Sequence, residues 1–307
     1  MSKINASIVV SMYNSKLKTI EVINKLFFPS ILNNASLDKE LVLLDDCSPL
    51  WEETKEMVEK YSERLKKNFG RFVFKRNVKN LGFAGAYNRA VSLAKGETLL
   101  IVNDDLYFPE GSIDRLVKSL GENKKMSVVA PITNGNRGWT YQYCSQAPLI
   151  KNYSQEELKK LEKFGKFSRI LMKEKLIEVD RITGFCFVIK RDLMKKFKGF
   201  NEDFKYGCFE DTDFMSRIAK KHKILVHAGV FVHHGCAKER GATSILQSYP
   251  KAVYYFLRNM HKYFRIWGYK NTSKVFFEVP LRFMTLRTIS LLFNKEMKKR
   301  KLKIRKI

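Results

Sequence analysis

Glu210, Asp211 and Asp213 place three acidic side chains within four positions, directly before an apolar run with helical spacing. Such a group could bind a metal ion, supply a general base, or form the acidic first turn of a helix, where the helix dipole favours negative charge. The other polar residues that the fold brings to the same place decide between these three interpretations.

Short apolar runs rich in Val, Ile, Leu and Phe precede most of those other polar residues. Five runs are typical of buried strands: residues 6–12, 40–45, 71–75, 97–103 and 127–132. Segments with helical spacing, such as 50–65, lie between them. Strands that alternate with helices predict an α/β fold with a mostly parallel central sheet and helices on both faces. In such sheets, ligands bind beyond the carboxyl ends of the strands.

Polar and acidic residues stand at that end of three predicted strands. The first strand ends in Ser11-Met12-Tyr13-Asn14, the second in Asp45-Asp46-Cys47-Ser48 and the fourth in Asn103-Asp104-Asp105. Each group by itself is explained by helix capping, because Asp and Ser are common in strand-to-helix turns. Three groups on one predicted edge favour a binding site.

A divalent cation suits part of this edge. The adjacent carboxylates of Asp104 and Asp105 offer the oxygen ligands that Mg²⁺ and Mn²⁺ prefer. A diphosphate would need such a cation here, since the sequence contains neither G-x-x-x-x-G-K-[ST] nor G-x-G-x-x-G. His233 and His234 close the apolar run 223–235 and are further candidate ligands, although a lone histidine is more often structural.

With these motifs in this order, the sequence resembles glycosyltransferase family 2, the inverting nucleotide-sugar transferases of GT-A fold, over about residues 6–236. The resemblance rests on SIVVSMYN, LLDDCSP, NLGFAGAYNRA, VNDDLYFP, TGFCFVIKRDLMKKFKGFNEDFKYGCFEDTDFMSRI and VHHG. It is nearest to the rhamnosyltransferase-like bacterial branch that builds surface polysaccharides. Asn103 departs from the family pattern, because it stands where a strict D-x-D motif has its first Asp.

The resemblance implies a role for each candidate residue. Tyr13 would stack on the nucleotide base with Ser11 nearby, Asp46 would bind the base edge, and Asp104 would contact the ribose or the sugar diphosphate. Asp105 would coordinate Mn²⁺ or Mg²⁺, and His233 or His234 would help to hold the metal or the diphosphate. Asp211 would be the catalytic base. Because the metal is then held elsewhere, we expect Glu210 to position the acceptor or raise its basicity, and Asp213 to begin the helix.

The implied reaction moves a sugar from a UDP- or dTDP-linked donor to a hydroxyl of a glycan or lipid-linked glycan, in the synthesis of surface polysaccharide. One-step inversion needs one carboxylate to take the proton of the acceptor and a cation to neutralise the departing diphosphate. A glycoside hydrolase would instead use two carboxylates that flank the bond, and spacing alone leaves that alternative open. The missing glycine fingerprint disfavours a Rossmann-type dehydrogenase.

The charge of the chain is unusually positive. Its 58 Lys and Arg residues against 31 Asp and Glu residues give a net charge of +27, which favours nucleic acid, an anionic membrane surface or a phosphorylated substrate as partner. A basic nucleic-acid-binding protein without catalysis is the alternative function. We expect no nucleic acid as partner, because the acids gather at the predicted ligand edge and no RNA-recognition or zinc-finger signature is present.

The domain organisation follows from the position of these motifs. We expect a catalytic domain over residues 1–240, with a nucleotide-binding half (1–130) and an acceptor-binding half (131–240), followed by a helical basic region over 241–307. Five scattered cysteines without a C-x-x-C pair, and an N-terminus without a secretory signal, favour the cytoplasm.

The basic C-terminal region has two interpretations. Residues 249–267 have helical apolar spacing and could pack on the catalytic domain. The segment 275–293 is too interrupted by charges to span a membrane, but it is amphipathic, with Leu281, Met284, Leu291 and Leu292 on one face, and a polybasic tail follows. These features predict peripheral binding at the anionic inner face of the cell membrane. Removing residues 275–307 is expected to release the protein from membranes and to spare donor hydrolysis.

Overall fold

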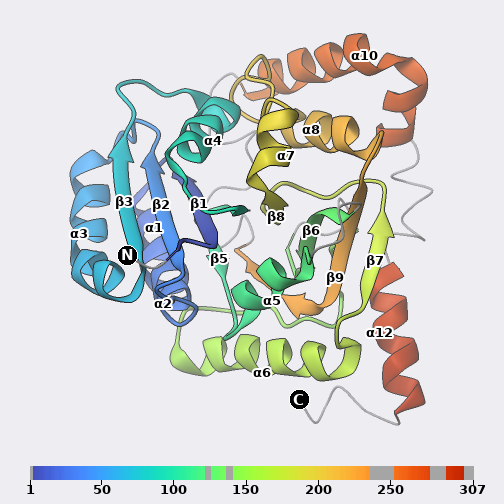
Figure 1. The fold of residues 1–307 in the computed structure, drawn as a ribbon, viewed down its shortest axis with the longest axis horizontal. Helices are drawn as coiled ribbons and strands as arrows, with labels where there is room; N and C mark the ends of the chain where they lie inside the picture. Colours follow the sequence, from blue (N-terminus) through green and yellow to red (C-terminus); the bar gives the residue numbers. More distant parts are fainter. Residues whose placement is uncertain (1–2, 122–125, 136–140, 236–251, 277–287, 301–307) are drawn as a thin grey trace.

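The computed structural model describes residues 3–121, 126–135, 141–235, 252–276 and 288–300. Its centre is a sheet of eight strands in the order β3-β2-β1-β4-β8-β6-β9-β7 (Figure 1). The strands are β1 (Ala6–Met12), β2 (Lys39–Asp45), β3 (Arg71–Arg76), β4 (Thr98–Val102), β6 (Met126–Ile132), β7 (Leu176–Val179), β8 (Cys186–Lys190) and β9 (Lys223–Phe231). A two-stranded ribbon pairs β5 (Leu106–Tyr107) with β10 (His233–His234).

All five predicted strands of the N-terminal half are present, and the sheet is mixed. Strands β3, β2, β1 and β4 are parallel neighbours, because a helical segment returns the chain to the same end of the sheet after each of β1, β2 and β3. Strand β8 is antiparallel to both β4 and β6, and β7 is antiparallel to β9. The parallel part therefore carries the predicted strand ends at one edge, as expected.

Helices cover both faces of the sheet, and alternate strand residues enter two separate cores. Val9 belongs to the core under α4, α6 and α8, whereas its neighbours Ile8 and Val10 belong to the core under α1 to α3 and α5. The helices are α1 (Leu17–Val22), α2 (Phe28–Leu32), α3 (Trp51–Asn68), α4 (Gly82–Leu93), α5 (Ser112–Ser119), α6 (Gln155–Met172), α7 (Arg191–Lys196), α8 (Glu210–Ala219), α10 (Ala252–Phe276) and α12 (Thr288–Lys299), with a π-helical turn (Ile23–Phe27) between α1 and α2.

The two C-terminal helices pack on the rest of the protein. Helix α10 lies over α8 (Figure 1), where Phe256, Met260 and Tyr263 join a small apolar cluster with Phe204 and Phe209. Helix α12 lies against α6 with another set of side chains buried: Ile289, Phe293 and Met297. Both helices are therefore packed on the predicted catalytic domain, as the first interpretation of this region predicted for residues 249–267.

Parts of the predicted C-terminal organisation lie outside the described residues, namely the boundary at 240–241, Leu281, Met284 and the end of the polybasic tail. Of the remaining predicted amphipathic face, Leu291 is exposed and Leu292 is half-buried. No helix within the described ranges is long and apolar enough to cross a membrane. The four cysteines in the described part of the chain are all free thiols.

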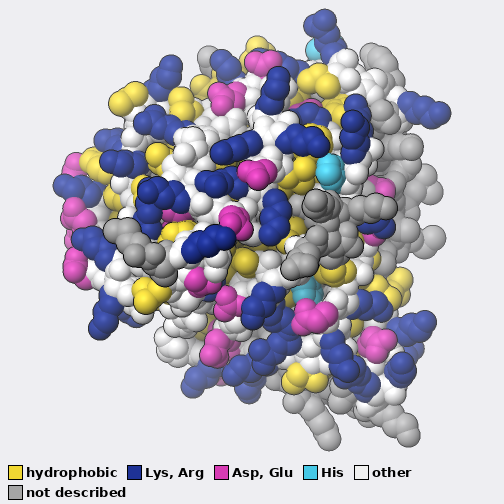
Figure 2. Space-filling view, in the orientation of Figure 1, with side chains coloured by type: hydrophobic (Ala, Val, Ile, Leu, Met, Phe, Trp, Pro, Cys, Tyr) yellow, Lys and Arg dark blue, Asp and Glu magenta, His cyan; other side chains and the backbone are white. Residues whose placement is uncertain are grey.

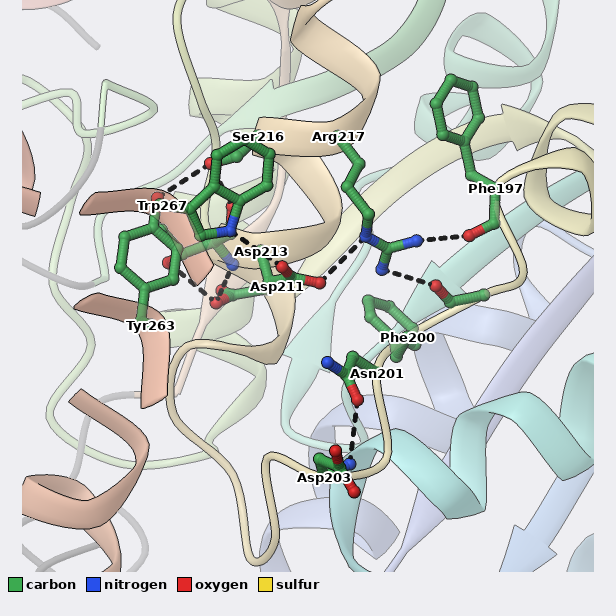
Figure 3. A network of polar contacts seen from close by, with 12 residues as sticks. Phe197, Phe200, Asn201, Asp203, Asp211, Asp213, Ser216, Arg217, Tyr263 and Trp267 are labelled. Atoms are coloured by element: carbon green, nitrogen blue, oxygen red, sulfur yellow. Dashed lines mark hydrogen bonds and ion pairs between the residues drawn. The ribbon is translucent and has the colours of Figure 1, made fainter. Parts of the chain in front are cut away.

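A polar network fixes α10 to α8. The Asp213 carboxylate accepts a 2.9 Å hydrogen bond from the Trp267 indole and forms an ion pair with Arg217, whose guanidinium also donates to the backbone carbonyls of Phe197 and Gly199 (Figure 3). Asp213 is buried, so each of these contacts replaces a lost contact with water. Asp213 is therefore more than the start of a helix, because it connects three segments.

Replacing Trp267 by Phe is expected to lower the free energy of unfolding by about 1–3 kcal/mol, because a buried carboxylate oxygen of Asp213 would lose its donor. The aromatic stacking on Tyr263 would remain. Thermal unfolding followed by circular dichroism measures the change. Trp51→Phe on α3 is the control, since its indole makes no hydrogen bond within the described residues; an equal melting temperature for Trp267→Phe and the wild type would contradict the role of this network.

Candidate active site

Asp46 stands at the carboxyl end of β2 and holds the start of α4. Its carboxylate accepts hydrogen bonds from the Asn77 side chain at 2.7 Å and from the backbone N–H groups of Leu81 and Gly82 at 2.9–3.1 Å. Burial raises the pKa of Asp46, although these donors oppose the rise. Gly82 has a φ of +71°, and a side chain there would be strained and would meet the backbone of Tyr206.

Tyr13 lies beside Asp46, directly after β1. Burial and then the charges of Asp46, Cys47 and Tyr206 raise the pKa of the Tyr13 phenol, so these groups share one neighbourhood. Ser11 lies in β1 opposite Leu44 and is partly exposed. The structure thus brings Tyr13 and Asp46 together at the predicted edge, with Tyr206 arriving from a distant segment.

The segment that follows β4 holds a buried acid–imidazole pair. Oδ2 of Asp105 lies 3.4 Å from Nε2 of His234, and the two residues are only 1% and 9% exposed. Asp104, next in the chain, is also buried. The β5–β10 ribbon makes this pairing, since His234 lies opposite Leu106 and the Gly235 N–H donates to the Asp105 carbonyl.

This pair fits a divalent cation. One carboxylate oxygen and one imidazole nitrogen, buried and this close, can share a metal ion of the Mn²⁺ or Mg²⁺ class. Nδ1 of the same ring is buried without a hydrogen-bond partner among the described residues. No cluster of three or more His, Cys, Asp or Glu ligands occurs within the described ranges.

His233 points to a different partner. Its Nδ1 lies 2.9 Å from Oδ1 of Asn134, and the same oxygen accepts a 3.3 Å hydrogen bond from the backbone N–H of His234. Because neighbouring residues of a strand face opposite sides, only one histidine of the pair can face Asp105. The structure brings His234 to Asp105 and His233 to Asn134.

The dipeptide Gly184-Phe185 joins the two halves of the candidate site. The Gly184 N–H donates a 2.9 Å hydrogen bond to Oδ2 of Asp211, while the Phe185 ring stacks on His234 with centroids 4.6 Å apart. The Phe185 carbonyl also accepts from the N–H of Asn103, beside the two aspartates. Asp211 and the Asp105–His234 pair are therefore held by consecutive residues.

Asp211 lies in the first turn of α8, partly exposed. Its Oδ1 accepts from the N–H and hydroxyl of Thr212, and Oδ2 has one donor among the residues that the structure describes. A β-carbon at Gly184 would come within 2.8 Å of the Asp211 β-carbon, so the glycine makes this approach possible. The loop before α8 is strained: three non-glycine residues, Tyr206, Cys208 and Phe209, have positive φ angles of 63–74°.

Glu210 is the buried member of the acidic group. It is 5% exposed, and its Oε2 has no hydrogen-bond partner among the described residues. Burial, and secondarily the charge of Asp211, raise the pKa of the Glu210 carboxyl well above its ordinary range. The three acids therefore have three environments: Glu210 favours the neutral form, Asp211 reaches solvent, and Asp213 is paired with Arg217.

The raised pKa of Glu210 predicts a pH-dependent effect of Glu210→Gln on stability. Below the unfolded-state pKa, near 4.5, the carboxyl is neutral in both states. As pH rises from there towards the folded-state pKa, only the unfolded state ionises, so the wild type loses stability that the variant keeps. We expect the melting temperature of the variant, relative to the wild type, to rise between acidic and neutral pH. Parallel curves for the two proteins would contradict a neutral Glu210.

Sequence reasoning missed four residues of this site. Asn77 and Asn134 follow β3 and β6, so the strand-end rule could have found both. Gly184 and Phe185 directly precede the apolar run of β8, which begins at Cys186, and their residue types indicate no chemistry.

The architecture is that of the GT-A glycosyltransferases. The mannosyltransferase PcManGT from Pyrobaculum calidifontis, solved with GDP-Man and Mn²⁺, matches 96% of this chain and 86% of its own, with a TM-score of 0.54 and 13% identity. S. aureus TarS, solved as residues 1–349 with UDP, matches 76% of this chain and 62% of its own, with a TM-score of 0.51 and 20% identity. At these identities the likeness shows the fold.

Residues 7–197 match the family model described as Glycosyl transferase family 2, and the chain belongs to this family. An N-acetylglucosaminyl-diphospho-decaprenol L-rhamnosyltransferase of Mycobacterium tuberculosis is 24% identical over 201 residues, which cover 59% of this chain and 65% of the relative. An uncharacterised glycosyltransferase of Methanocaldococcus jannaschii is 25% identical over 225 residues, which cover 73% and 68%. The predicted family is thus confirmed, and the match spans about two thirds of each relative's length.

Proposed function

We propose that the protein is an inverting glycosyltransferase that moves a sugar from a UDP- or dTDP-linked donor to a hydroxyl of a glycan or lipid-linked glycan. The observation that carries this proposal is the Gly184-Phe185 connection, which holds an accessible carboxylate and a buried acid–imidazole pair next to one another. Family membership supports it. So do the names of a relative that acts on a diphospho-decaprenol acceptor and of neighbours solved with UDP or GDP-Man.

Asp211 is the proposed base. The Gly184 N–H and the two Thr212 donors orient its carboxylate, and Oδ2 keeps room to take the proton of an acceptor hydroxyl as that oxygen attacks the anomeric carbon. Glu210 is neutral in this proposal, so it adds no competing charge and no second nucleophile. A single base is what one-step inversion requires, and this separates the proposal from a glycosidase with two flanking carboxylates.

The donor would bind along the parallel strand ends. Tyr13 would stack on the base, Asp46 would fix its edge while holding the start of α4, and Ser11 and Asp104 would lie along the ribose and diphosphate. Asp105 and His234 would hold Mn²⁺ or Mg²⁺, which when bound neutralises charge on the departing diphosphate.

A screen of nucleoside diphosphates and their sugars tests the function. We expect at least one UDP- or dTDP-sugar to raise the melting temperature in the presence of Mn²⁺ or Mg²⁺, and to be hydrolysed slowly without acceptor. If no nucleoside diphosphate stabilises the protein with either metal, the proposal fails. A titration with DNA at increasing salt tests the nucleic-acid alternative, which requires binding that weakens steeply with salt.

We also propose that the protein works in surface glycan synthesis, peripherally at the inner face of the cell membrane, through its basic C-terminal region. The net charge of +27 supports an anionic surface as partner. Deleting residues 275–307 is a poor test, because the deletion would uncover the apolar surface that Ile289, Phe293 and Met297 cover. Point substitutions on the folded surface are therefore preferable.

A further inference from the structure

A pocket of about 420 Å³ opens on α6, outside the candidate active site. Pro148, Phe164 and Phe167 supply its apolar part, and Lys159, Lys160 and Lys163 supply its basic rim. The Phe164 ring stacks on Phe293 of α12 behind it, so the apolar part is backed by the core. We name this cavity the α6 pocket.

Two of the three rim lysines carry a charge that no ion pair within the described ranges offsets. Lys160 pairs with Glu157, whereas Lys159 and Lys163 are exposed and form no ion pair among the described residues. Glu156 is the one acid among the described lining residues. Basic side chains continue along the lower edge of the molecule in Figure 2, where Figure 1 places α6. The pocket therefore combines an apolar interior with a net positive entrance.

Two exposed apolar side chains are the chain neighbours of residues at or beside the pocket. Leu149 is 48% exposed and follows Pro148 in the chain. Leu291 of α12 is 57% exposed and follows Ser290, whose carbonyl accepts a hydrogen bond from the lining residue Gln146. Single exposed apolar residues are ordinary, so these two add to the proposal only through the apolar, lysine-rimmed cavity itself, since membrane-interface surfaces combine apolar and basic side chains.

We propose that the α6 pocket binds an anionic phospholipid of the membrane, with its phosphate at Lys159 and Lys163 and the start of an acyl chain over Phe164 and Phe167. This inference rests on the membrane partner in the proposed function and adds a site on α6 to the basic C-terminal region proposed there.

The position of the pocket suits a lipid-linked acceptor. The carbonyl of the lining residue Pro148 accepts a hydrogen bond from Nδ2 of Asn134, and Oδ1 of the same side chain meets His233. Two hydrogen bonds thus join the pocket wall to the histidine pair of the candidate site. Docking here would hold the bilayer surface on the α6 side of that pair.

Co-sedimentation of the full chain with vesicles tests the proposal. We expect binding to phosphatidylcholine vesicles that contain phosphatidylglycerol, and roughly 30-fold weaker binding for the double variant Lys159→Gln, Lys163→Gln. The matched control is Lys55→Gln with Lys67→Gln on α3, which removes two exposed lysines from a different side and should change binding less than about threefold. Equal binding by both double variants, weakened or not, overturns the proposal.

Two further measurements test the lipid chemistry. Short-chain phosphatidic acid below its micelle concentration is expected to compete with vesicles, and inorganic phosphate is not; equal competition by the two overturns the acyl-chain part. Phe167→Ala is expected to keep low-salt binding and to lose the binding that persists at high salt, where surface charges are screened. Donor binding with Mn²⁺ is measured on the same variants and should be unchanged, so a failure of the transferase function is distinguishable from a failure at the pocket.

Discussion

Asp211→Asn is expected to lower kcat for sugar transfer by about 10²–10⁴-fold, the usual contribution of a positioned general base. The amide keeps the size of the side chain, and its oxygen can still accept a hydrogen bond from Gly184 or Thr212. Donor affinity should therefore change little, since the donor binds at the strand ends. Steady-state rates with saturating donor and acceptor, together with calorimetric donor binding, separate the two effects.

The control for this experiment is Asp192→Asn. Asp192 is also an acid in the first turn of a helix, but it lies on α7, at the opposite end of β8 from Gly184 and Phe185. It should retain wild-type rates, and Glu210→Gln should retain most of them, because a neutral carboxyl and an amide are alike in charge. Near-normal turnover by Asp211→Asn would remove Asp211 from the role of base, and a larger loss in Glu210→Gln would transfer that role.

The sequence predicted the strand ends well, because a buried parallel strand leaves a strong local signal. An uninterrupted apolar run is followed by polar residues, and the carboxyl ends of parallel neighbours must meet at one edge. Asp46 and Asp105 belong to strand-end groups that this signal predicts, and the family resemblance singles them out within those groups. Asn134 obeys the same rule but follows β6, and it was missed because no acid accompanies it.

The strand pattern alone does not choose between the members of an adjacent pair, because that choice depends on register. Asp45 is buried and pairs with Arg76, whereas Asp46 turns to α4. His233 and His234 divide in the same way, and the register that selects His234 comes from pairing with β5, a contact distant in sequence. The sequence pattern therefore identifies two adjacent candidate residues, and strand pairing in the folded protein decides which of the two faces the site.

The sequence likewise does not predict the environment of each of the three acids in the first turn of α8. Glu210, Asp211 and Asp213 occupy one helical turn, yet consecutive positions on a helix face different directions. Glu210 enters the interior, Asp213 faces α10 and the loop at Phe197, and Asp211 faces Gly184. Only the last direction leads to the strand ends, which is why one acid is proposed as base.

Asp105→Asn and His234→Ala are each expected to weaken metal-dependent donor binding by at least tenfold, because loss of a single ligand or its supporting contact commonly has this effect at metal sites. The difference in donor affinity between variant and wild type should appear with Mn²⁺ or Mg²⁺ present. It should shrink when EDTA removes the metal, because the substitutions weaken only the binding of the ion. Calorimetric titration of the nucleoside diphosphate found in the screen, with and without metal, measures the difference.

His261→Ala is the matched control, because His261 is an exposed histidine on α10, away from the β5–β10 ribbon, and its loss should leave the metal-dependent part of binding unchanged. Direct Mn²⁺ binding, followed by electron paramagnetic resonance with the diphosphate present, gives a readout besides activity. If metal still strengthens donor binding fully in His234→Ala but not in His233→Ala, then His233 is the metal ligand and the assignment of His234 is wrong. If both variants keep it, the ion is held by other groups, and Asp105 and His234 form only a buried polar contact that supports the Phe185 ring.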